Sequence, residues 1–428
     1  MARGANTRLM VFSCALLLLA GAFFSVPERV SASEDIRRQI NEKNDEIKRL
    51  EADAKRYQAE IVESEKSANT LQGQIRIIDQ TIRRLDAEIK VTDAKIVRAT
   101  LEIRALGTEI GETEDAIAVD RVRLAALVRE LAERDQEPPL ATFMKYDSLS
   151  AFFTVLDELA AVQGELHRVI VDLRVSRAEL ADQKGRTEAK RAELAELARD
   201  LADQKSIQAG ERKARATLLA ETRNQEKRYQ QLLADAKKKR EALETEIEAL
   251  EATLRATFDR SLLPKAGDGV LGWPLPEPIV VTQNFGNTEF ARGGAYGGKG
   301  HNGADFRAAN GTAVFAAERG TVRAAGDTDL GCRRVSYGKW ILIDHPNNLS
   351  TLYAHLSLAK VSAGDTVNRG TLIAYSGATG YATGPHLHFT VFAREAVEVI
   401  DYRSKVCGTI MKLPISPNSG YLNPLDYL

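Results

Sequence analysis

An apolar residue at every third or fourth position over the first third of the chain most constrains its fold. The steps alternate between four and three residues through Leu71, Ile75, Ile78, Ile82, Leu85 and Ile89. The same register extends back to Ile36 and forward to Leu131, with polar interruptions at Lys43, Ser64, Thr92, Thr113 and Asp120. A sustained 3.5-residue period with charged flanks is typical of a coiled-coil seam. It predicts one helix roughly 140 Å long, at a rise of about 1.5 Å per residue.

An adjacent proline pair, Pro138 and Pro139, ends that pattern. Proline lacks the backbone N–H and its ring clashes with the preceding helical turn. A second helical run, with a weaker seam, extends from near Leu159 to about Phe258. Two helices of similar length around a break indicate an antiparallel hairpin with its tip near residues 135–157, and a parallel dimeric rod is the alternative. Apolar residues at the tip, Phe143 among them, form either a small local core or a docking point.

A fall in charge density marks the boundary to a second kind of domain. Residues 1–264 carry 91 of the 119 Asp, Glu, Lys and Arg residues, and residues 265–428 carry 28. We therefore expect a solvated helical arm over residues 33–263, a Pro- and Gly-containing linker over 264–269, and a compact domain over 270–428.

The first 32 residues have the pattern of a secretory signal peptide. Arg3 and Arg8 precede an uncharged, mostly apolar run from Leu9 to Phe24, and small residues allow cleavage before Ser33. We expect a secreted, extracytoplasmic protein in the periplasm or at the cell surface, or one anchored by its N-terminus if the segment is not cleaved. A formal net charge of -1 gives no indication of a nucleic-acid partner.

Two cysteines, Cys332 and Cys407, remain after the predicted cleavage, and both lie in the C-terminal domain. In an oxidising compartment two such cysteines suggest one disulfide, and the alternative is a pair of small buried thiols.

Short β-rich runs separated by glycine-rich turns make up the C-terminal domain, and they predict an all-β fold. Five of the six histidines of the chain occur here. In the segment from Gly384 to Phe389, His386 and His388 are two residues apart, so a strand projects both from one face. His301 and Asp305 are four residues apart. Together with one histidine of the pair they supply two imidazoles and a carboxylate, a set that suits zinc with an open fourth position.

Three motifs of this domain resemble those of the LytM/lysostaphin-type zinc metallopeptidases, which cut peptidoglycan peptides. They are His301-x-x-x-Asp305, Tyr353-Ala354-His355-Leu356 and Gly384-Pro385-His386-Leu387-His388-Phe389, in the order of that family. The resemblance implies a duplicated-hybrid-motif-like β fold and one zinc ion held by His301, Asp305 and His388. It also implies that His355 and His386 are catalytic. His345 stands at a position that is often histidine in this family but holds no metal, and we interpret it as structural.

The arrangement of a secreted coiled-coil hairpin before this domain resembles the EnvC-like murein hydrolase activators. That resemblance implies peptidoglycan as substrate and recruitment by an FtsE–FtsX-like division complex through the coiled coil. Many members of that group have lost metal ligands and only activate a cell-wall amidase, whereas this chain keeps all five site residues. The chain departs from the common domain pattern around Cys332 and around Cys407, and we hypothesise that a disulfide joins these two segments.

The combined prediction is a multidomain α+β chain with a coiled-coil arm and a zinc metalloendopeptidase domain that acts in cell-wall remodelling or division. The alternative is a non-catalytic activator of an amidase. Zinc makes water a better nucleophile and polarises the scissile carbonyl. We expect His386 to move the proton and His355 to bind the oxyanion or orient the water, an assignment that the sequence leaves reversible.

Overall fold

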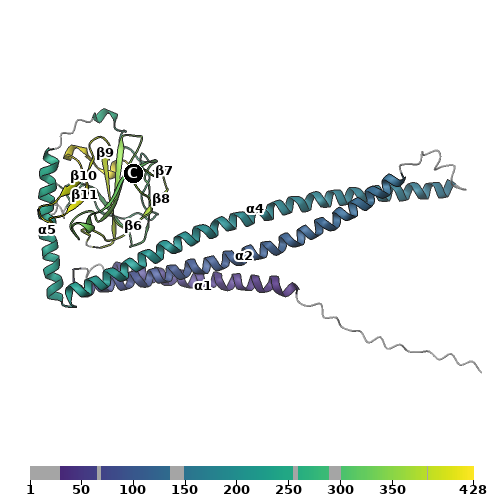
Figure 1. Cartoon of the computed structure of the whole chain (residues 1–428), viewed down its shortest axis with the longest axis horizontal. Helices are drawn as coiled ribbons and strands as arrows, with labels where there is room; N and C mark the ends of the chain where they lie inside the picture. Colours follow the sequence, from purple (N-terminus) through teal and green to yellow (C-terminus); the bar gives the residue numbers. More distant parts are fainter. Residues whose placement is uncertain (1–28, 65–68, 135–148, 254–258, 289–299, 383) are drawn as a thin grey trace, which may run out of the picture.

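A computed structural model of the chain describes residues 29–64, 69–134, 149–253, 259–288, 300–382 and 384–428 (Figure 1). Within these ranges, long helices form an extended arm and a shorter helix runs along the C-terminal domain, whose strands pair antiparallel. The predicted fold class, long helices followed by an all-β domain, is confirmed. Residues 1–28, with most of the predicted signal peptide, and residues 135–148 at the predicted tip lie outside the described residues.

The first predicted helix is in fact two helices, so the prediction of an unbroken rod from Ile36 to Leu131 is wrong. Helix α1 (Arg29–Ser64) and helix α2 (Leu71–Arg134) pack side by side in opposite directions. Cross-helix contacts join Lys95 to Glu51 and Arg98 to Asn44. Ile47 buries against Val91 and Ala94 of α2, and these contacts form a small core.

The sequence carried a signal for this break at Thr70. Its side-chain oxygen accepts the backbone N–H of Gly73 at 3.0 Å, as an N-cap residue does at the start of a helix. Every residue from Glu63 to Thr70 except Ala68 is polar. Counting in heptads across this stretch keeps the register, but the stretch has no apolar side chain larger than alanine that could pack in a coiled-coil seam.

The hairpin is formed by α2 and helix α4 (Leu149–Thr222), which pair antiparallel within the one chain. Thr92 contacts Gln204 at 2.9 Å and Lys190 pairs with Glu102 at 2.8 Å. The antiparallel hairpin is therefore the arrangement that the structure shows. Near the tip, the Phe153 side chain is 58% exposed, so it does not belong to a buried core among the described residues.

The second predicted helix is also interrupted, which corrects the expectation of a continuous run to Phe258. Helix α4 ends at Thr222 and helix α5 (Glu226–Thr253) starts after a sharp corner. Arg223 and Asn224 adopt left-handed backbone angles (φ 50° and 56°), which cost a non-glycine residue about 1–2 kcal/mol each. Nothing in the local sequence requires this corner.

Contacts from the rest of the molecule hold the corner in place. The Glu226 carboxylate accepts the backbone N–H of Leu71 at 2.8 Å, at the start of α2. Tyr229 of α5 is buried beside Leu71 and Leu218 of α4. Tertiary packing thus outweighs a helical sequence preference, and it turns α5 toward the β domain.

The β domain has one large antiparallel sheet and a two-stranded ribbon. The large sheet has the order β1-β2-β9-β6-β5-β4-β7, with β12 beside β9 and with β8 between β3 and β6, and β10 pairs with β11. The strands are β1 (Val281–Gln283), β2 (Ala304–Arg307), β3 (Ala313–Phe315), β4 (Gly320–Asp327), β5 (Lys339–Asp344), β6 (Leu349–Ala359), β7 (Thr366–Val367), β8 (Leu372–Ser376), β9 (His386–Ala393), β10 (Glu398–Arg403), β11 (Ile410–Ile415) and β12 (Tyr421–Leu422). Short 3-10 helices occur at η2 (Arg260–Leu262), η4 (Thr328–Leu330), η5 (Asn418–Gly420) and η6 (Pro424–Asp426).

Both faces of the large sheet are covered. On β5, Ile341 and Ile343 contribute to one apolar cluster, whereas Trp340 and Leu342 contribute to another. Alternate side chains of a strand point to opposite faces, so the continuous apolar run in β5 reflects burial on both sides.

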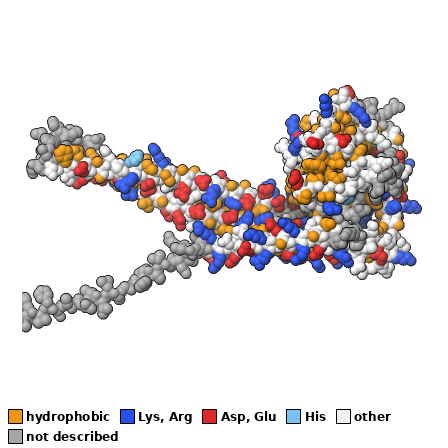
Figure 2. All heavy atoms as spheres, turned by 180° about the vertical axis from the view of Figure 1, so that it is seen from behind, with side chains coloured by type: hydrophobic (Ala, Val, Ile, Leu, Met, Phe, Trp, Pro, Cys, Tyr) orange, Lys and Arg blue, Asp and Glu red, His pale blue; other side chains and the backbone are white. Residues whose placement is uncertain are grey.

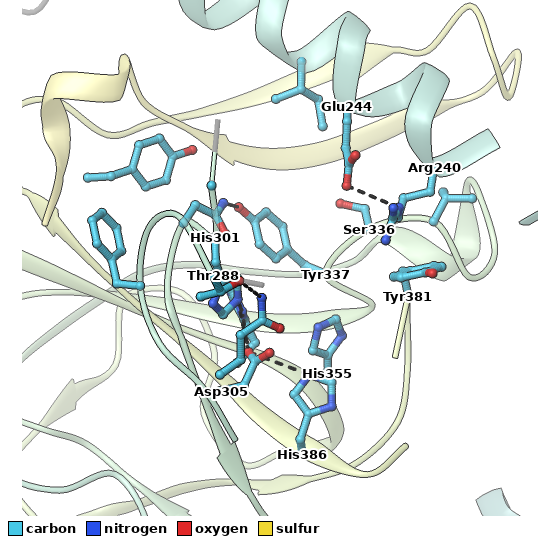
Figure 3. A pocket seen from close by; sticks show the side chains of 18 of the residues that line it. Arg240, Glu244, Thr288, His301, Asp305, Ser336, Tyr337, His355, Tyr381 and His386 are labelled. Atoms are coloured by element: carbon cyan, nitrogen blue, oxygen red, sulfur yellow. Dashed lines mark hydrogen bonds and ion pairs between the residues drawn. The ribbon is translucent and has the colours of Figure 1, made fainter. Parts of the chain in front are cut away.

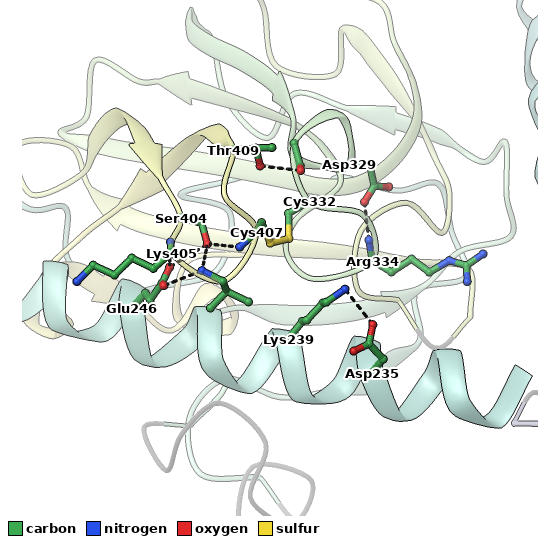
Figure 4. Close-up of a disulfide and its surroundings, with 12 residues drawn as sticks. Asp235, Lys239, Glu246, Asp329, Cys332, Arg334, Ser404, Lys405, Cys407 and Thr409 are labelled. Atoms are coloured by element: carbon green, nitrogen blue, oxygen red, sulfur yellow. Dashed lines mark hydrogen bonds and ion pairs between the residues drawn. A yellow bond between two sulfur atoms is a disulfide. The ribbon is translucent and has the colours of Figure 1, made fainter. Parts of the chain in front are cut away.

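The hypothesised disulfide is present (Figure 4). Cys332, after η4, is bonded to Cys407, in the turn between β10 and β11, with their Cα atoms 5.7 Å apart. Leu243 of α5 packs into the same apolar cluster as Cys332. Glu246 of α5 accepts backbone N–H groups of Lys405 and Val406 at 3.2 and 3.0 Å. The disulfide thus fixes part of the surface on which α5 lies.

The arm also contacts the β domain directly through α2 and α4. Leu85 and Ile207 pack on Tyr375. The buried Arg84 side chain donates to the backbone carbonyl of Asn310, whose side-chain amide donates to Glu211 of α4. These contacts between the arm and the β domain bury the Glu211 carboxylate away from water. Burial raises the pKa of Glu211 from an ordinary value of 4.5 to about 7.

The surface of the arm carries positive and negative side chains interspersed along its length (Figure 2). Such mixing is typical of a solvated helical face. Within the described part of the chain, no helix combines the length and the apolar character that crossing a membrane requires.

The raised pKa of Glu211 predicts how the stability of the folded chain depends on pH. Between pH 4.5 and 7 the folded chain keeps a proton on Glu211 that the unfolded chain has lost. Stability therefore falls as pH rises through this window, and Glu211→Gln should flatten the dependence. Thermal unfolding across pH 4.5–8 measures it, with the exposed Glu109→Gln as control. An unchanged slope in Glu211→Gln would contradict the assignment.

Candidate metal centre and active site

The candidate site lies on neighbouring strands β2 and β9 (Figure 3). Their register pairs Asp305 with His388 and Arg307 with His386. Cross-strand partners share a face of the sheet, and residues two apart on a strand share it as well. All four side chains line one cleft. His301, three residues before β2, is held by an isolated backbone bridge to Gly286, which follows β1.

Three of the predicted residues, His301, Asp305 and His388, meet at the centre of the site. One ligand atom from each lies within 4.8 Å of the others. His388 Nδ1 is 2.9 Å from Asp305 Oδ1, and His301 Nε2 is 3.3 Å from the same oxygen. The three side chains are buried, where ionisable groups need partners.

The orientation of the two imidazoles fits a metal. The Nδ1 atom of His301 lies 3.0 Å from the carbonyl oxygen of Asn284, so Nδ1 carries the hydrogen and Nε2 presents its lone pair to the cluster. The Nε2 atom of His388 contacts Thr390 Oγ1 at 2.9 Å, which leaves Nδ1 for the cluster. Metal-binding histidines in proteins are held by such outer contacts. A His₂Asp set of this kind suits zinc with a fourth position open.

Electrostatics keep the Asp305 carboxylate ionised. Burial alone would raise its pKa, but the side-chain contacts with His301 and His388 outweigh burial and hold the pKa of Asp305 well below its usual range. Burial lowers the pKa of His388, which favours the neutral imidazole that a metal requires.

The two predicted catalytic histidines lie together at the edge of this cluster. The ring centroids of His355 and His386 are 4.7 Å apart. His355 Nδ1 donates to the carbonyl of Thr379 and His386 Nδ1 donates to that of Gly384, each at 2.8 Å. In the neutral form of each ring, Nε2 therefore carries the lone pair and can accept a hydrogen bond. In this state His355 suits the orientation of a water better than the binding of an oxyanion.

His355 has an unusual backbone conformation for a non-glycine residue, with φ at 59°. Left-handed residues inside a strand are rare and concentrate at functional sites. Burial, together with the neighbouring His386 and His388, lowers the pKa of His355 well below its usual value. The ring is therefore neutral and available as a hydrogen-bond acceptor at neutral pH.

Gly303, between His301 and Asp305, is required by close packing. A Cβ atom there would lie 2.5 Å from the carbonyl oxygen of Phe389 and 2.8 Å from Cε1 of His388. The absence of a side chain thus lets β2 approach β9 closely enough for the ligand atoms to meet.

His345 lies apart from the cluster, in agreement with its interpretation as a structural residue. Its Nδ1 donates to the carbonyl of Arg319 at 2.9 Å and its Nε2 contacts Thr351 Oγ1 at 2.8 Å. Both ring nitrogens are thereby satisfied inside the fold.

Helix α5 contributes to the walls of the same cleft (Figure 3). The buried Arg240 side chain lies over the ring of Tyr381, with 4.2 Å from the guanidinium carbon to the ring centroid. Tyr381 is in the loop that leads to His386. Farther along α5, Glu251 accepts a hydrogen bond from Tyr421 beside the cleft. The helix therefore lies across one side of the candidate site.

Sequence reasoning missed the outer contacts and the helix. Thr390 follows His388 by two residues on β9, so strand alternation could have indicated it. The other partners are the backbone carbonyls of Asn284, Thr379 and Gly384, which the sequence cannot indicate because every residue has a carbonyl. The position of α5 depends on the corner at Arg223, which the sequence does not encode locally.

Comparisons with known proteins concern the β domain. Residues 299–399 match peptidase family M23. An uncharacterized metalloprotease of Haemophilus influenzae is 42% identical over 89 residues, which are 21% of this chain and 18% of that protein. Peptidoglycan DD-endopeptidase ShyA of Vibrio cholerae is 40% identical over 95 residues, which are 22% of this chain and 20% of that protein.

Among solved structures, the catalytic domain of the antimicrobial peptidase lysostaphin from Staphylococcus simulans is 28% identical, with a TM-score of 0.26. That match covers 34% of this chain and 90% of the solved domain. The chain spans about a fifth of the length of the two curated relatives. The resemblance of the C-terminal domain to the LytM-type peptidases is confirmed.

The contact between Thr390 and His388 predicts an effect on metal affinity. Thr390→Val keeps the shape of the side chain but removes the hydroxyl that holds the His388 ring, so zinc affinity should fall roughly 10–100-fold. Competition with a chromophoric chelator measures it, and the exposed Thr366→Val is the matched control. Equal affinities in both variants would show that the hydroxyl does not orient the ring.

Proposed function

We propose that this chain is a secreted zinc metalloendopeptidase that hydrolyses peptide cross-links or stems of peptidoglycan. The observation that carries the proposal is the meeting of His301, Asp305 and His388 beside two imidazoles whose Nδ1 atoms are bound to backbone carbonyls. The names of its M23 relatives, which include a peptidoglycan DD-endopeptidase, support the substrate.

In this proposal His301, Asp305 and His388 hold one zinc ion. Zinc supplies Lewis acidity, which polarises a peptide carbonyl and makes water a stronger nucleophile at neutral pH. His386 Nε2 takes the proton from the attacking water and returns it to the leaving amine. Its Nδ1–H contact with the Gly384 carbonyl stabilises the ring when it is protonated.

His355 orients the water through Nε2, because its Nδ1 is committed to the Thr379 carbonyl. The two rings lie close enough to serve one reacting group. Protonation of both rings at once is disfavoured, since like charges so near each other repel. The proposal therefore gives the proton to His386 and leaves His355 neutral.

The arm and α5 have a separate role in the proposal. The coiled coil positions the enzyme at sites of cell-wall remodelling or division, through an FtsE–FtsX-like membrane complex. Helix α5 restrains the cleft, because Arg240 and Leu243 occupy its wall. The alternative, a non-catalytic activator of a cell-wall amidase, draws support from the same covering helix, because the covered surface would equally suit a partner protein.

Substitution of the two kinds of histidine separates metal binding from turnover. His301→Ala should abolish both zinc binding and peptide release from purified peptidoglycan. His386→Ala should keep most of the zinc and lose turnover by roughly 10²–10⁴-fold, the usual contribution of a general base. Metal analysis together with release of soluble peptides measures both. An unaltered cleavage rate in either variant would refute the site.

Loosening α5 tests the proposed restraint. Leu243→Glu places a charge in the buried apolar cluster between α5 and the β domain and should weaken the packing of the helix by roughly 2–4 kcal/mol. Because the helix then covers the cleft less, the rate of peptide release should rise. The matched control is Leu233→Glu, since Leu233 lies exposed on the same helix. Equal rates in the two variants would mean that α5 does not limit the reaction. Amidase stimulation by Leu243→Glu without peptide release would favour the alternative function.

A further inference from the structure

An arginine, Arg307, lines the cleft beside one member of the candidate catalytic pair. Arg307 is the last residue of β2, two residues after Asp305, and its cross-strand partner is His386. Strand alternation directs Arg307 to the same face as Asp305, and its side chain lines the cleft. The intervening Phe306 points the other way and is fully buried in the core.

Arg307 differs from the arginines that support the fold. Arg323 is bound to Asp344 and to two backbone carbonyls, and Arg369 is bound to Glu318. For Arg307, the described residues supply no ion pair or side-chain hydrogen bond, and the side chain is exposed to the cleft. An exposed arginine is ordinarily only solvated. Because Arg307 lines the cleft and is the cross-strand partner of His386, its guanidinium is available to a molecule that enters the cleft.

The backbone that carries Arg307 is held firmly. Its N–H donates to the carbonyl of Val280 at 2.8 Å, and β2 lies between β1 and β9 in the sheet. A binding group on a strand paired on both sides is placed more accurately than one on a loop.

The spacing sets which part of a substrate Arg307 reaches. Two residues along a strand span about 7 Å, so Arg307 starts about 7 Å from the ligand residue Asp305. A substrate residue in extended conformation spans about 3.4 Å. With the scissile carbonyl at the His301–Asp305–His388 cluster, the long arginine side chain meets substituents of a residue directly next to the scissile amide.

The chemistry of the guanidinium indicates which substituent of that substrate residue Arg307 would bind. Its planar fork binds a carboxylate through two parallel hydrogen bonds, which are stronger than those to neutral groups.

We infer that Arg307 is a specificity-determining residue that selects peptides with a free carboxylate on the residue next to the scissile amide. The inference rests on the proposed function, whose substrate class it narrows. Cross-links made through a diamino dicarboxylic acid keep such a carboxylate beside the amide, whereas glycine bridges have none. Arg307 therefore favours the first kind of cross-link.

The test uses two synthetic peptides that differ only in this group, a carboxylate in one and a carboxamide in the other. The zinc-loaded full chain is used in two forms, with the native α5 and with Leu243→Glu. Cleavage is followed as kcat and KM, and binding is measured separately in the His386→Ala background. We expect the acid to be preferred about tenfold, mainly through KM, as one charge-assisted pair would give.

Arg307→Gln should bring the acid-to-amide ratio to about one, and Arg307→Lys should keep part of the preference. Arg319→Gln is the matched control, because Arg319 is exposed and does not line the cleft, and it should keep the full ratio. If Arg307 served only to tune His386, Arg307→Gln would slow both peptides equally. That outcome, or a full ratio retained in Arg307→Gln, would overturn the inference.

The binding measurement separates this inference from the proposed function. Arg307-dependent preference in binding without any turnover would leave the inference standing and reject the peptidase. Equal turnover of both peptides would support the peptidase and reject the inference. No binding of either peptide, with α5 native or loosened, would also reject the inference.

Discussion

The antiparallel register between β2 and β9 is the constraint on which the site depends. It sets Asp305 opposite His388 and Arg307 opposite His386. A slip of one residue would turn either set of side chains to the opposite face and separate the candidate metal ligands. The register is held from the buried side by Phe306 and Phe389, which pack in one core. The chemistry on the cleft side thus depends on apolar packing on the other.

The second constraint is the position of helix α5, which lies against the cleft that β2 and β9 form. The β domain builds an open cleft, and the arm places α5 against it. The corner between α4 and α5 holds Arg223 and Asn224 in left-handed conformations, which Glu226 and Tyr229 offset through contacts with the start of α2. The covering helix is therefore tied to the base of the arm.

The sequence predicted the elements whose signals are local. The heptad pattern from Leu71 onward identified α2, and the spacing of His386 and His388 placed both on one face of a strand. The heptad register failed at Thr70, where it runs on in number across a break made by helix capping. The prediction of one continuous second helix failed at Arg223, where tertiary contacts hold a corner. The outer partners of the histidines are mostly backbone carbonyls, such as that of Thr379. Carbonyls are present at every residue, so no sequence pattern marks them.

The most direct test of the account is the identity of the bond that the zinc-loaded full chain cuts in purified peptidoglycan. Mass spectrometry of the products, for the native chain and for Leu243→Glu, shows which new ends form. The account predicts new amino and carboxyl ends within the peptides, absent when His386 is replaced. Whole stem peptides freed from the glycan by an added amidase, with no internal peptide cleavage in either form of the chain, would contradict it.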